Sequence, residues 1–321
     1  MSGSIGASRI PTKSVKNTLS NYNTQVLFAV KGYKEACPTG SFVKYYNTRT
    51  EKEDGHGDID LVVYVKPKEG ESLQDVKRRF VRTCEILDDS VTVPFTHGKN
   101  IGKKVQMYGD IITVQYPICK NYPDEEQKYV QIDNMIVTNE KEYYFMQQFL
   151  SLPAIEQSLI TASMRVVPTN EIIKFFTDMG LSEVIPQNIE ENQRLEIVIG
   201  TRQWSLRLVT LDENNKEIKK KRQVLFSNSS IAIFNYMIHY FYLYNVSYVE
   251  DFQKDYTYIL EHVYDKYKDY HDANVYFNRI IGILKSICTV KPGEVGTLKE
   301  VNKMNSIAYC KNYFNYINGN K

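Results

Sequence analysis

The chain has 321 residues, of which 42% are apolar and 24% are charged, and its formal net charge is +2. This length is enough for one large domain or two ordinary ones, and the near balance of charge excludes a protein that is drawn to nucleic acid by a strong overall positive field. No stretch approaches the ~18 uncharged apolar residues that a membrane-spanning helix needs, and residues 1–20 lack the apolar segment of a secretory signal. We therefore expect a cytoplasmic protein with no membrane partner.

Composition also indicates the kind of genome that encodes the chain. Tyrosine is abundant, with 25 residues, and Lys, Asn and Ile are frequent, a bias that fits an AT-rich genome. This indicates a phage or a low-GC host, and a phage protein would act in the host cytoplasm or in the virion. The five cysteines are an odd number without C-x-x-C spacing, which favours free thiols over disulfides or a zinc site.

The first half of the chain predicts an α/β catalytic domain over residues 15–150, preceded by a mobile polar arm over residues 1–14. In chain order, the patterns predict a helix at 15–30, a short helix at 41–46, a strand at 58–65, a helix that begins after Ser72, a short strand at 90–94, a hairpin at 104–117, a strand at 130–137, and a helix capped by Asn139.

Residues 151–321 predict a mainly helical C-terminal domain with a small antiparallel insert. The expected elements are a helix at 169–179, strands at 194–199, 204–211 and 223–226, and helices at 231–244, 248–269, 274–287 and 300–316. A basic run at residues 219–222 is expected in a solvated hairpin turn, with contact to RNA or DNA phosphates as the alternative.

The most informative pattern is a small-residue turn followed by an acid-bearing strand. Gly40-Ser41 is typical of a turn that enters a helix, where backbone N–H groups can hold phosphate. Asp58 and Asp60 stand two residues apart at the head of an apolar strand, so their side chains leave one face of it, roughly 6.5–7 Å apart. Two such carboxylates repel each other unless they are protonated or share a cation. Hard divalent ions such as Mg²⁺ or Mn²⁺ meet that need.

A third acid is expected on a neighbouring strand, and two residues compete for that place. Asp133 lies inside the apolar run 130–137, whereas Asp110 lies at the predicted turn of the hairpin. We favour Asp133, because a carboxylate enclosed by apolar residues is costly to bury unless ionic partners compensate. Asp110 stays open as the alternative.

The Gly-Ser turn, the Asp-x-Asp pair and Asp133 together resemble the signature of the DNA polymerase beta-like nucleotidyltransferase superfamily, over about residues 25–150. The gap of 16 residues between Ser41 and Asp58 is longer than usual in that superfamily. The excess falls in a segment of loop composition, which can lengthen at little cost.

The resemblance implies a mixed sheet flanked by helices, and transfer of a nucleoside monophosphate from an NTP such as ATP to a hydroxyl acceptor, with release of pyrophosphate. It implies two bound Mg²⁺ or Mn²⁺ ions. The three acids would be catalytic residues and metal ligands, and nucleotide binding would fall to Gly40, Ser41 and Lys44.

Partners of the triphosphate and of the reaction are less defined. Candidate cations for the triphosphate, besides Lys44, are Arg79, Arg165 and Lys174. His56 is expected as a flexible loop histidine, with substrate contact as the alternative. The acceptor stays open between RNA, DNA, a small molecule and a protein. An alternative to the enzyme is a protein that keeps this fold without turnover, such as a phage particle component or a nucleotide sensor.

Overall fold

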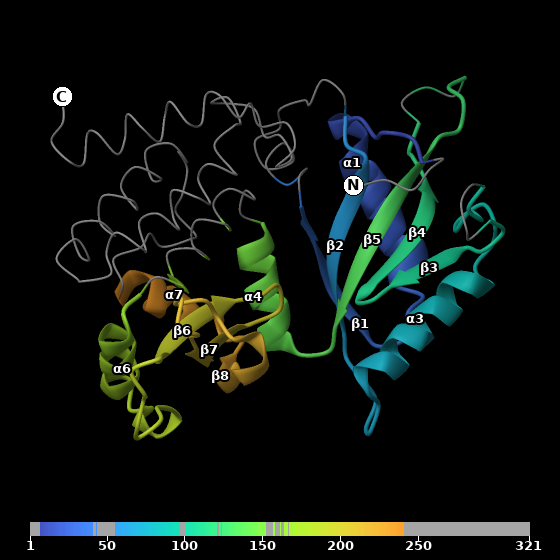
Figure 1. Cartoon of the computed structure of the whole chain (residues 1–321). Helices are drawn as coiled ribbons and strands as arrows, with labels where there is room; N and C mark the ends of the chain where they lie inside the picture. The colour runs from blue at the N-terminus through green and yellow to red at the C-terminus, as the bar shows by residue number, and fades with distance from the viewer. Residues whose placement is uncertain are drawn as a thin grey trace, which may run out of the picture. The chain divides into compact units, whose positions relative to one another are not determined.

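The chain divides into two compact units, Met1–Ser151 and Leu152–Lys321, and each is described by itself. The computed structural model (Figure 1) describes residues 7–40, 43, 55–96, 101–120, 122, 124–151, 157, 161, 164–165 and 167–240.

The first unit is built on a mixed five-stranded sheet with the strand order β1-β2-β5-β4-β3 (Figure 1). Strands β2 and β5 are parallel neighbours, and the other neighbouring pairs are antiparallel. The strands are β1 (Tyr33–Thr39), β2 (Asp58–Val65), β3 (Val105–Tyr108), β4 (Ile111–Pro117) and β5 (Tyr129–Val137).

One face of this sheet packs against two helices. Ile59 and Leu61 of β2 are buried in one cluster with Tyr22 of the first helix and Phe80 of the second. Because side chains alternate along a strand, the residues between them in β2 point to the opposite face. The helices of this unit are α1 (Thr12–Tyr22), continued by a π-helical turn η1 (Asn23–Leu27), α3 (Leu73–Ile86) and α4 (Glu140–Leu150).

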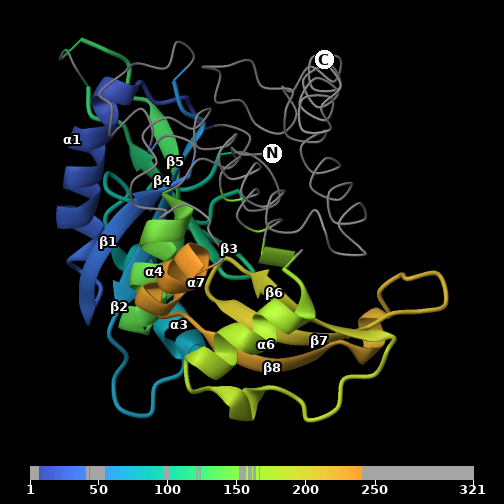
Figure 2. The same cartoon turned by 90° about the vertical axis from the view of Figure 1, so that its left-hand side faces the viewer.

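Helix α4 packs on that opposite face. The ring of Tyr143 lies 6.0 Å from the ring of Tyr64 in β2, and its hydroxyl is hydrogen-bonded to the thiol of Cys37 in β1. Figure 2 shows α1 and α4 on opposite sides of β1 and β2. Helix α4 therefore covers the C-terminal half of β2, and the acids at the head of the strand lie on the same face.

Two helix starts predicted from the sequence are confirmed with their caps. The Ser72 hydroxyl accepts the Asp75 N–H at 3.3 Å, and the Asp75 carboxylate accepts the Ser72 N–H at 3.1 Å, which is a capping box. The Asn139 side chain accepts the N–H of Lys141 at 2.8 Å and starts α4.

Three expectations about the first unit need correction. Residues 8–14 are packed against the sheet instead of forming a mobile arm: Ile10 is fully buried, and α1 begins at Thr12. The helix expected at 15–30 ends in a π-helical turn at Leu27. No strand forms at residues 90–94, where Val93 makes an isolated bridge to Gln115.

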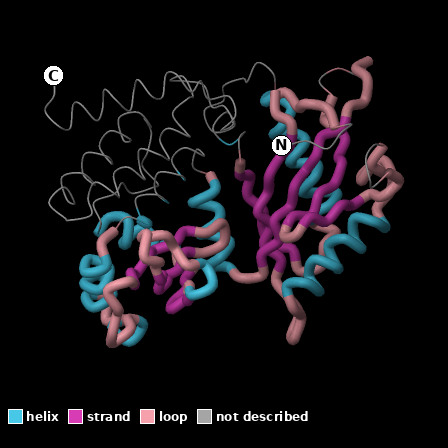
Figure 3. The backbone as a smooth tube through the Cα atoms, in the orientation of Figure 1, coloured by secondary structure: helices cyan, strands magenta, loops and turns pink. Residues whose placement is uncertain are grey.

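The described part of the second unit contains a small antiparallel sheet and two helices (Figure 3). One face of the sheet carries an aromatic cluster, in which the Phe176 ring lies 6.3 Å from Trp204 and 5.7 Å from Phe226. Its elements are α6 (Thr169–Asp178), η2 (Ser182–Val184), β6 (Gln193–Ile199), β7 (Trp204–Thr210), η3 (Lys219–Lys221), β8 (Gln223–Asn228) and α7 (Ile231–Tyr240).

The chain is therefore of mixed α/β class, with a helix-flanked mixed sheet and a separate antiparallel sheet. The basic run forms the 3-10 turn η3 in the connection between β7 and β8, and Arg222 after it is hydrogen-bonded to Glu217. The helices expected at 248–269, 274–287 and 300–316 lie outside the described residues. Among the helices that the structure describes, none combines the length and the apolar character needed to cross a membrane.

Candidate functional site

The three acids predicted from the sequence lie on one face of the central parallel strand pair. Asp60 of β2 is the direct partner of Asp133 of β5, and Asp58 is the partner of Gln131. Direct partners on neighbouring strands point to the same side of a sheet. The register thus brings Asp58, Asp60 and Asp133 together on the face that carries α4.

Asp60 and Asp133 belong to a polar row that crosses all five strands. Read from β1 to β3, successive direct partners are Thr39, Asp60, Asp133, Thr113 and Gln106. All five are polar residues that a sheet face covered by apolar packing would not favour. The Thr39 hydroxyl is buried and makes no hydrogen bond within the described residues. A buried oxygen on the strand position next to Asp60 is thus without a hydrogen-bond partner among the described residues.

Asp60 has a strongly perturbed carboxyl. Burial, and after it the neighbouring charges of Asp58 and Asp133, together raise its pKa from 3.8 to about 8. All three causes disfavour the carboxylate, and each would be offset by a bound cation. Without a cation, Asp60 is the acid that holds a proton near neutral pH.

Asp133 is held by one hydrogen-bond donor from its own strand and one from the neighbouring strand β4. The Thr113 hydroxyl donates to Oδ1 at 2.6 Å, and the Gln131 amide donates to Oδ1 at 3.0 Å and to Oδ2 at 2.9 Å. Burial raises the pKa of Asp133, while these two donors lower it. The donors therefore favour the ionised form and fix the orientation of the carboxylate.

Gly40 follows β1 and lies directly against Asp60. Its φ is +79°, a left-handed conformation that favours glycine, and a Cβ placed there would lie 2.1 Å from Asp60 Oδ2. The backbone at Gly40 can approach the acids only because it carries no side chain. The other two predicted nucleotide ligands, Ser41 and Lys44, lie outside the described residues.

The N-terminal segment is hydrogen-bonded near the starts of both acid-bearing strands. The Ser8 N–H donates to the Tyr129 carbonyl at the start of β5, at 2.7 Å, and Ile10 forms a two-way backbone bridge with His56, two residues before Asp58. The Thr12 hydroxyl lies 2.9 Å from His56 Nε2.

His56 is therefore a fully buried residue just before the start of β2 and not the flexible loop histidine expected from the sequence. The glycines that flank it suggested a loop. The bridge to Ile10 is a contact across 46 residues of sequence, and a local sequence pattern cannot predict it.

The other candidates of the first unit, Asp110 and Arg79, are placed away from the acids. Asp110 is hydrogen-bonded to Lys77 of α3, and its side chain is 61% exposed. Arg79 of α3 is paired with Glu71 in the preceding loop. Helix α3 packs on the face opposite the acids. Arg165 and Lys174 belong to the second unit.

The fit of a divalent metal can be judged from the donors present. Carboxylates of three aspartates and the buried Thr39 hydroxyl are oxygen donors of the kind that Mg²⁺ and Mn²⁺ take. Across the described part of the chain, no set of three His, Cys, Asp or Glu side chains converges closely enough to hold an ion as it stands. Gln131 bridges both oxygens of Asp133, so ion binding there requires the amide to turn away.

Comparison with known proteins assigns the chain to no family. No protein-family model matches it, and no curated protein matches it either.

Proposed function

We propose that this chain is a metal-dependent nucleotidyltransferase, which transfers a nucleoside monophosphate from an NTP to a hydroxyl acceptor. The observation that carries the proposal is the pairing of Asp60 with Asp133 on parallel strands, with Asp58 on the same face and the Gly40 backbone against Asp60. Like charges that are close together and partly removed from water are costly unless cations join them. Such a cluster against the backbone of a left-handed glycine favours phosphoryl chemistry over a structural role.

The residues have separate tasks in this reaction. Asp58 and Asp60 would hold two Mg²⁺ or Mn²⁺ ions together with Asp133, and the ions, when bound, would neutralise the triphosphate and the leaving group. The turn that begins at Gly40 would hold the β- and γ-phosphates, with Ser41 and Lys44 as its further ligands. Asp133 would accept the proton of the acceptor hydroxyl, whose oxygen bonds to the α-phosphorus as pyrophosphate leaves.

The hydrogen bonds to Asp133 support its role as a base. Thr113 and Gln131 both donate to it, and these hydrogen bonds favour the carboxylate against the burial that raises its pKa. Asp60, which has two like charges as neighbours, is favoured as the acid until cations bind. The different surroundings of the two carboxyls, donors at Asp133 and like charges at Asp60, are the basis for dividing the base and ligand roles between them.

A nucleotide-binding protein without turnover is the second candidate. The observation that favours it is the Gln131 amide, which occupies both Asp133 oxygens. If that amide never releases Asp133, the site can hold a nucleotide at Asp58 and Asp60 yet lack a base.

Label transfer separates these two functions. The full chain is incubated with each NTP labelled either at the α- or at the γ-phosphate, with Mg²⁺ or Mn²⁺, and with RNA, DNA or cell lysate as the source of acceptor. We expect acid-stable label in an acceptor from the α-labelled NTP alone. Asp133→Asn should abolish transfer while nucleotide binding persists.

Asp124→Asn is the matched control, because Asp124 is an exposed aspartate of the same unit. Nucleotide binding without transfer in the parent protein would support the second candidate. A parent protein that neither binds NTP nor transfers label would contradict both.

A further inference from the structure

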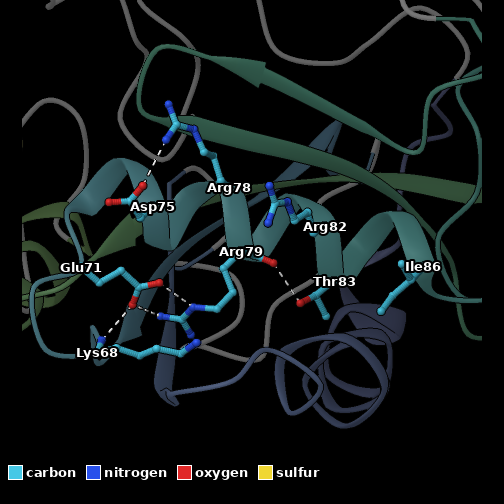
Figure 4. A pocket seen from close by; sticks show the side chains of 8 residues that line it. All are labelled: Lys68, Glu71, Asp75, Arg78, Arg79, Arg82, Thr83 and Ile86. Carbon is cyan, nitrogen blue, oxygen red and sulfur yellow. Dashed lines mark hydrogen bonds and ion pairs between the residues drawn. The ribbon is translucent and has the colours of Figure 1, made fainter.

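A second polar feature of the first unit lies on the outer side of α3. It is a solvent-open hollow of about 400 Å³, lined by the loop before the helix and by one side of the helix itself (Figure 4). Helix α3 packs on the apolar face of the sheet, whereas the three aspartates point from the other face. The hollow is therefore separate from the candidate active site.

The two acids that line the hollow are already engaged. Glu71 accepts Arg79 Nε at 2.9 Å and Arg79 Nη2 at 2.6 Å, and it also accepts the backbone N–H of Lys68 at 2.8 Å. Asp75 accepts the backbone N–H of Ser72 in the capping box and pairs with Arg78 at 3.1 Å. Their hydrogen bonds hold the pKa of both carboxyls below the ordinary value.

The basic residues that line the hollow outnumber these acids. Figure 4 shows Lys68, Arg78, Arg79 and Arg82 around it, four cations against two carboxylates. The ammonium of Lys68 and the guanidinium of Arg82 make no ion pair or side-chain hydrogen bond in the described part of the chain. Two positive charges at the hollow are thus left without a bonded acid.

The arginines of α3 repel one another, and a bound anion would relieve this repulsion. Arg78 and Arg82 are four residues apart on α3, a spacing at which like charges destabilise a helix. Arg79 lies between them with its side chain only 14% exposed, locked in place by the two-point contact with Glu71. The hollow is therefore lined by one prealigned guanidinium and by the exposed side chains of Lys68 and Arg82.

We propose that this hollow binds a phosphate group. Guanidinium groups bind phosphate through paired hydrogen bonds, and a lysine ammonium adds a point charge. The phosphate can come from a small phosphorylated compound or from the backbone of a nucleic acid, and its ligands here are Lys68 and Arg82, with Arg79 positioned beside them. The proposal concerns the opposite face of the sheet from the aspartates, so it goes beyond the proposed function and does not depend on it.

Calorimetric titration in EDTA tests this site alone, because binding at the aspartates requires divalent ions. The full chain is titrated at low ionic strength with pyrophosphate, and separately with a single-stranded DNA oligonucleotide. Lys68→Gln with Arg82→Gln should lower the affinity for at least one probe about tenfold or more, as expected for loss of charge-assisted hydrogen bonds. The control is Lys13→Gln with Lys16→Gln, which removes two exposed charges from α1.

The outcomes distinguish a small phosphorylated ligand from a nucleic acid, and they also show whether the proposal fails. Loss of pyrophosphate binding in the Lys68/Arg82 variant identifies a small-ligand site, and loss of oligonucleotide binding alone identifies a nucleic-acid contact. Absence of binding to either probe by the parent protein would overturn the proposal. It would also be overturned if the Lys13/Lys16 control lost as much affinity as the Lys68/Arg82 variant. Both substitutions in that variant are at exposed positions, so the melting temperature should stay close to that of the parent and confirm that folding is unchanged.

Discussion

Asp60 links the electrostatics of the fold to the proposed chemistry. Its carboxyl is buried beside two other carboxyls, and its pKa is raised from 3.8 to about 8. A raised pKa in the folded state means that the unfolded chain releases the proton at a lower pH than the folded chain. The protein in EDTA should therefore lose stability as the pH rises from about 4 to about 8.

Asp60→Asn removes this pH dependence. We expect the urea midpoint of the parent protein in EDTA to fall between pH 6 and pH 8.5, and the fall to be smaller in the variant. Mg²⁺ or Mn²⁺ should restore part of the parent's stability at pH 8.5, because the ion replaces the proton on Asp60. An equal fall in both proteins would show that Asp60 titrates normally.

Gly40 provides a second test at the scale of residues. In Gly40→Ala the new Cβ would lie 2.1 Å from Asp60 Oδ2 and 3.0 Å from Asp60 Cγ, and the backbone φ of +79° adds strain. We expect loss of stability as well as of nucleotide affinity. Asp60→Ala removes both clashing atoms, so the double variant should be more stable than the sum of the two single effects predicts. Additive losses in urea unfolding would mean that Gly40 and Asp60 are not in contact.

Thr113 is a positioning residue for Asp133, since its hydroxyl donates to Oδ1 at 2.6 Å. Removal of this donor in Thr113→Val should raise the pKa of Asp133 and shift the acidic limb of the pH profile of label transfer to higher pH. Thr83→Val on α3 is the control, because Thr83 donates to a backbone carbonyl of its own helix. An unshifted profile in Thr113→Val would remove Asp133 from the role of base.

At the scale of elements, residues 8–14 hold the starts of the two acid-bearing strands in place. Ile10 is fully buried and forms backbone hydrogen bonds with His56 in both directions, at 2.8 and 2.9 Å. Ile10→Ala should cost about 2–5 kcal/mol of stability and weaken metal-dependent nucleotide binding, because the start of β2 is released.

Ile86→Ala is the same substitution at a residue that is 84% exposed, and its cost should stay within about 0.5 kcal/mol. The free energies of unfolding come from urea titrations of both variants. Equal costs would show that the packing of Ile10 does not contribute to the stability of the first unit.

Local patterns account for the elements that could be predicted. The apolar run with two leading acids defined β2, and the caps at Ser72 and Asn139 defined two helix starts, because each signal lies within a few neighbouring residues. The packing of residues 8–14 was missed, since polar composition indicates an arm while a single buried Ile10 anchors it. The choice of Asp133 over Asp110 rested on flanking residues, and the register now brings Asp133 beside Asp60. The hydrogen bond from Thr113 depends on strand order, which the sequence does not display.

At the scale of the whole molecule, the first unit contains everything that the proposed site requires. The aspartates, the Gly40 turn and the core cluster that supports them all lie within Met1–Ser151. This segment expressed alone should unfold cooperatively in urea and retain metal-dependent NTP binding. A chain of 151 residues that is soluble only as an unfolded or molten species would show that the second unit is needed for folding.

The most direct test of the central claim is a crystal structure of the full chain with Mn²⁺ and a non-hydrolysable NTP, measured for anomalous scattering. The account predicts manganese peaks about 2.1 Å from carboxylate oxygens of Asp58, Asp60 and Asp133, with Gln131 turned away from Asp133 and the triphosphate against the turn at Gly40. A structure with bound nucleotide elsewhere, no manganese at the three aspartates and Gln131 still bonded to both Asp133 oxygens would contradict it.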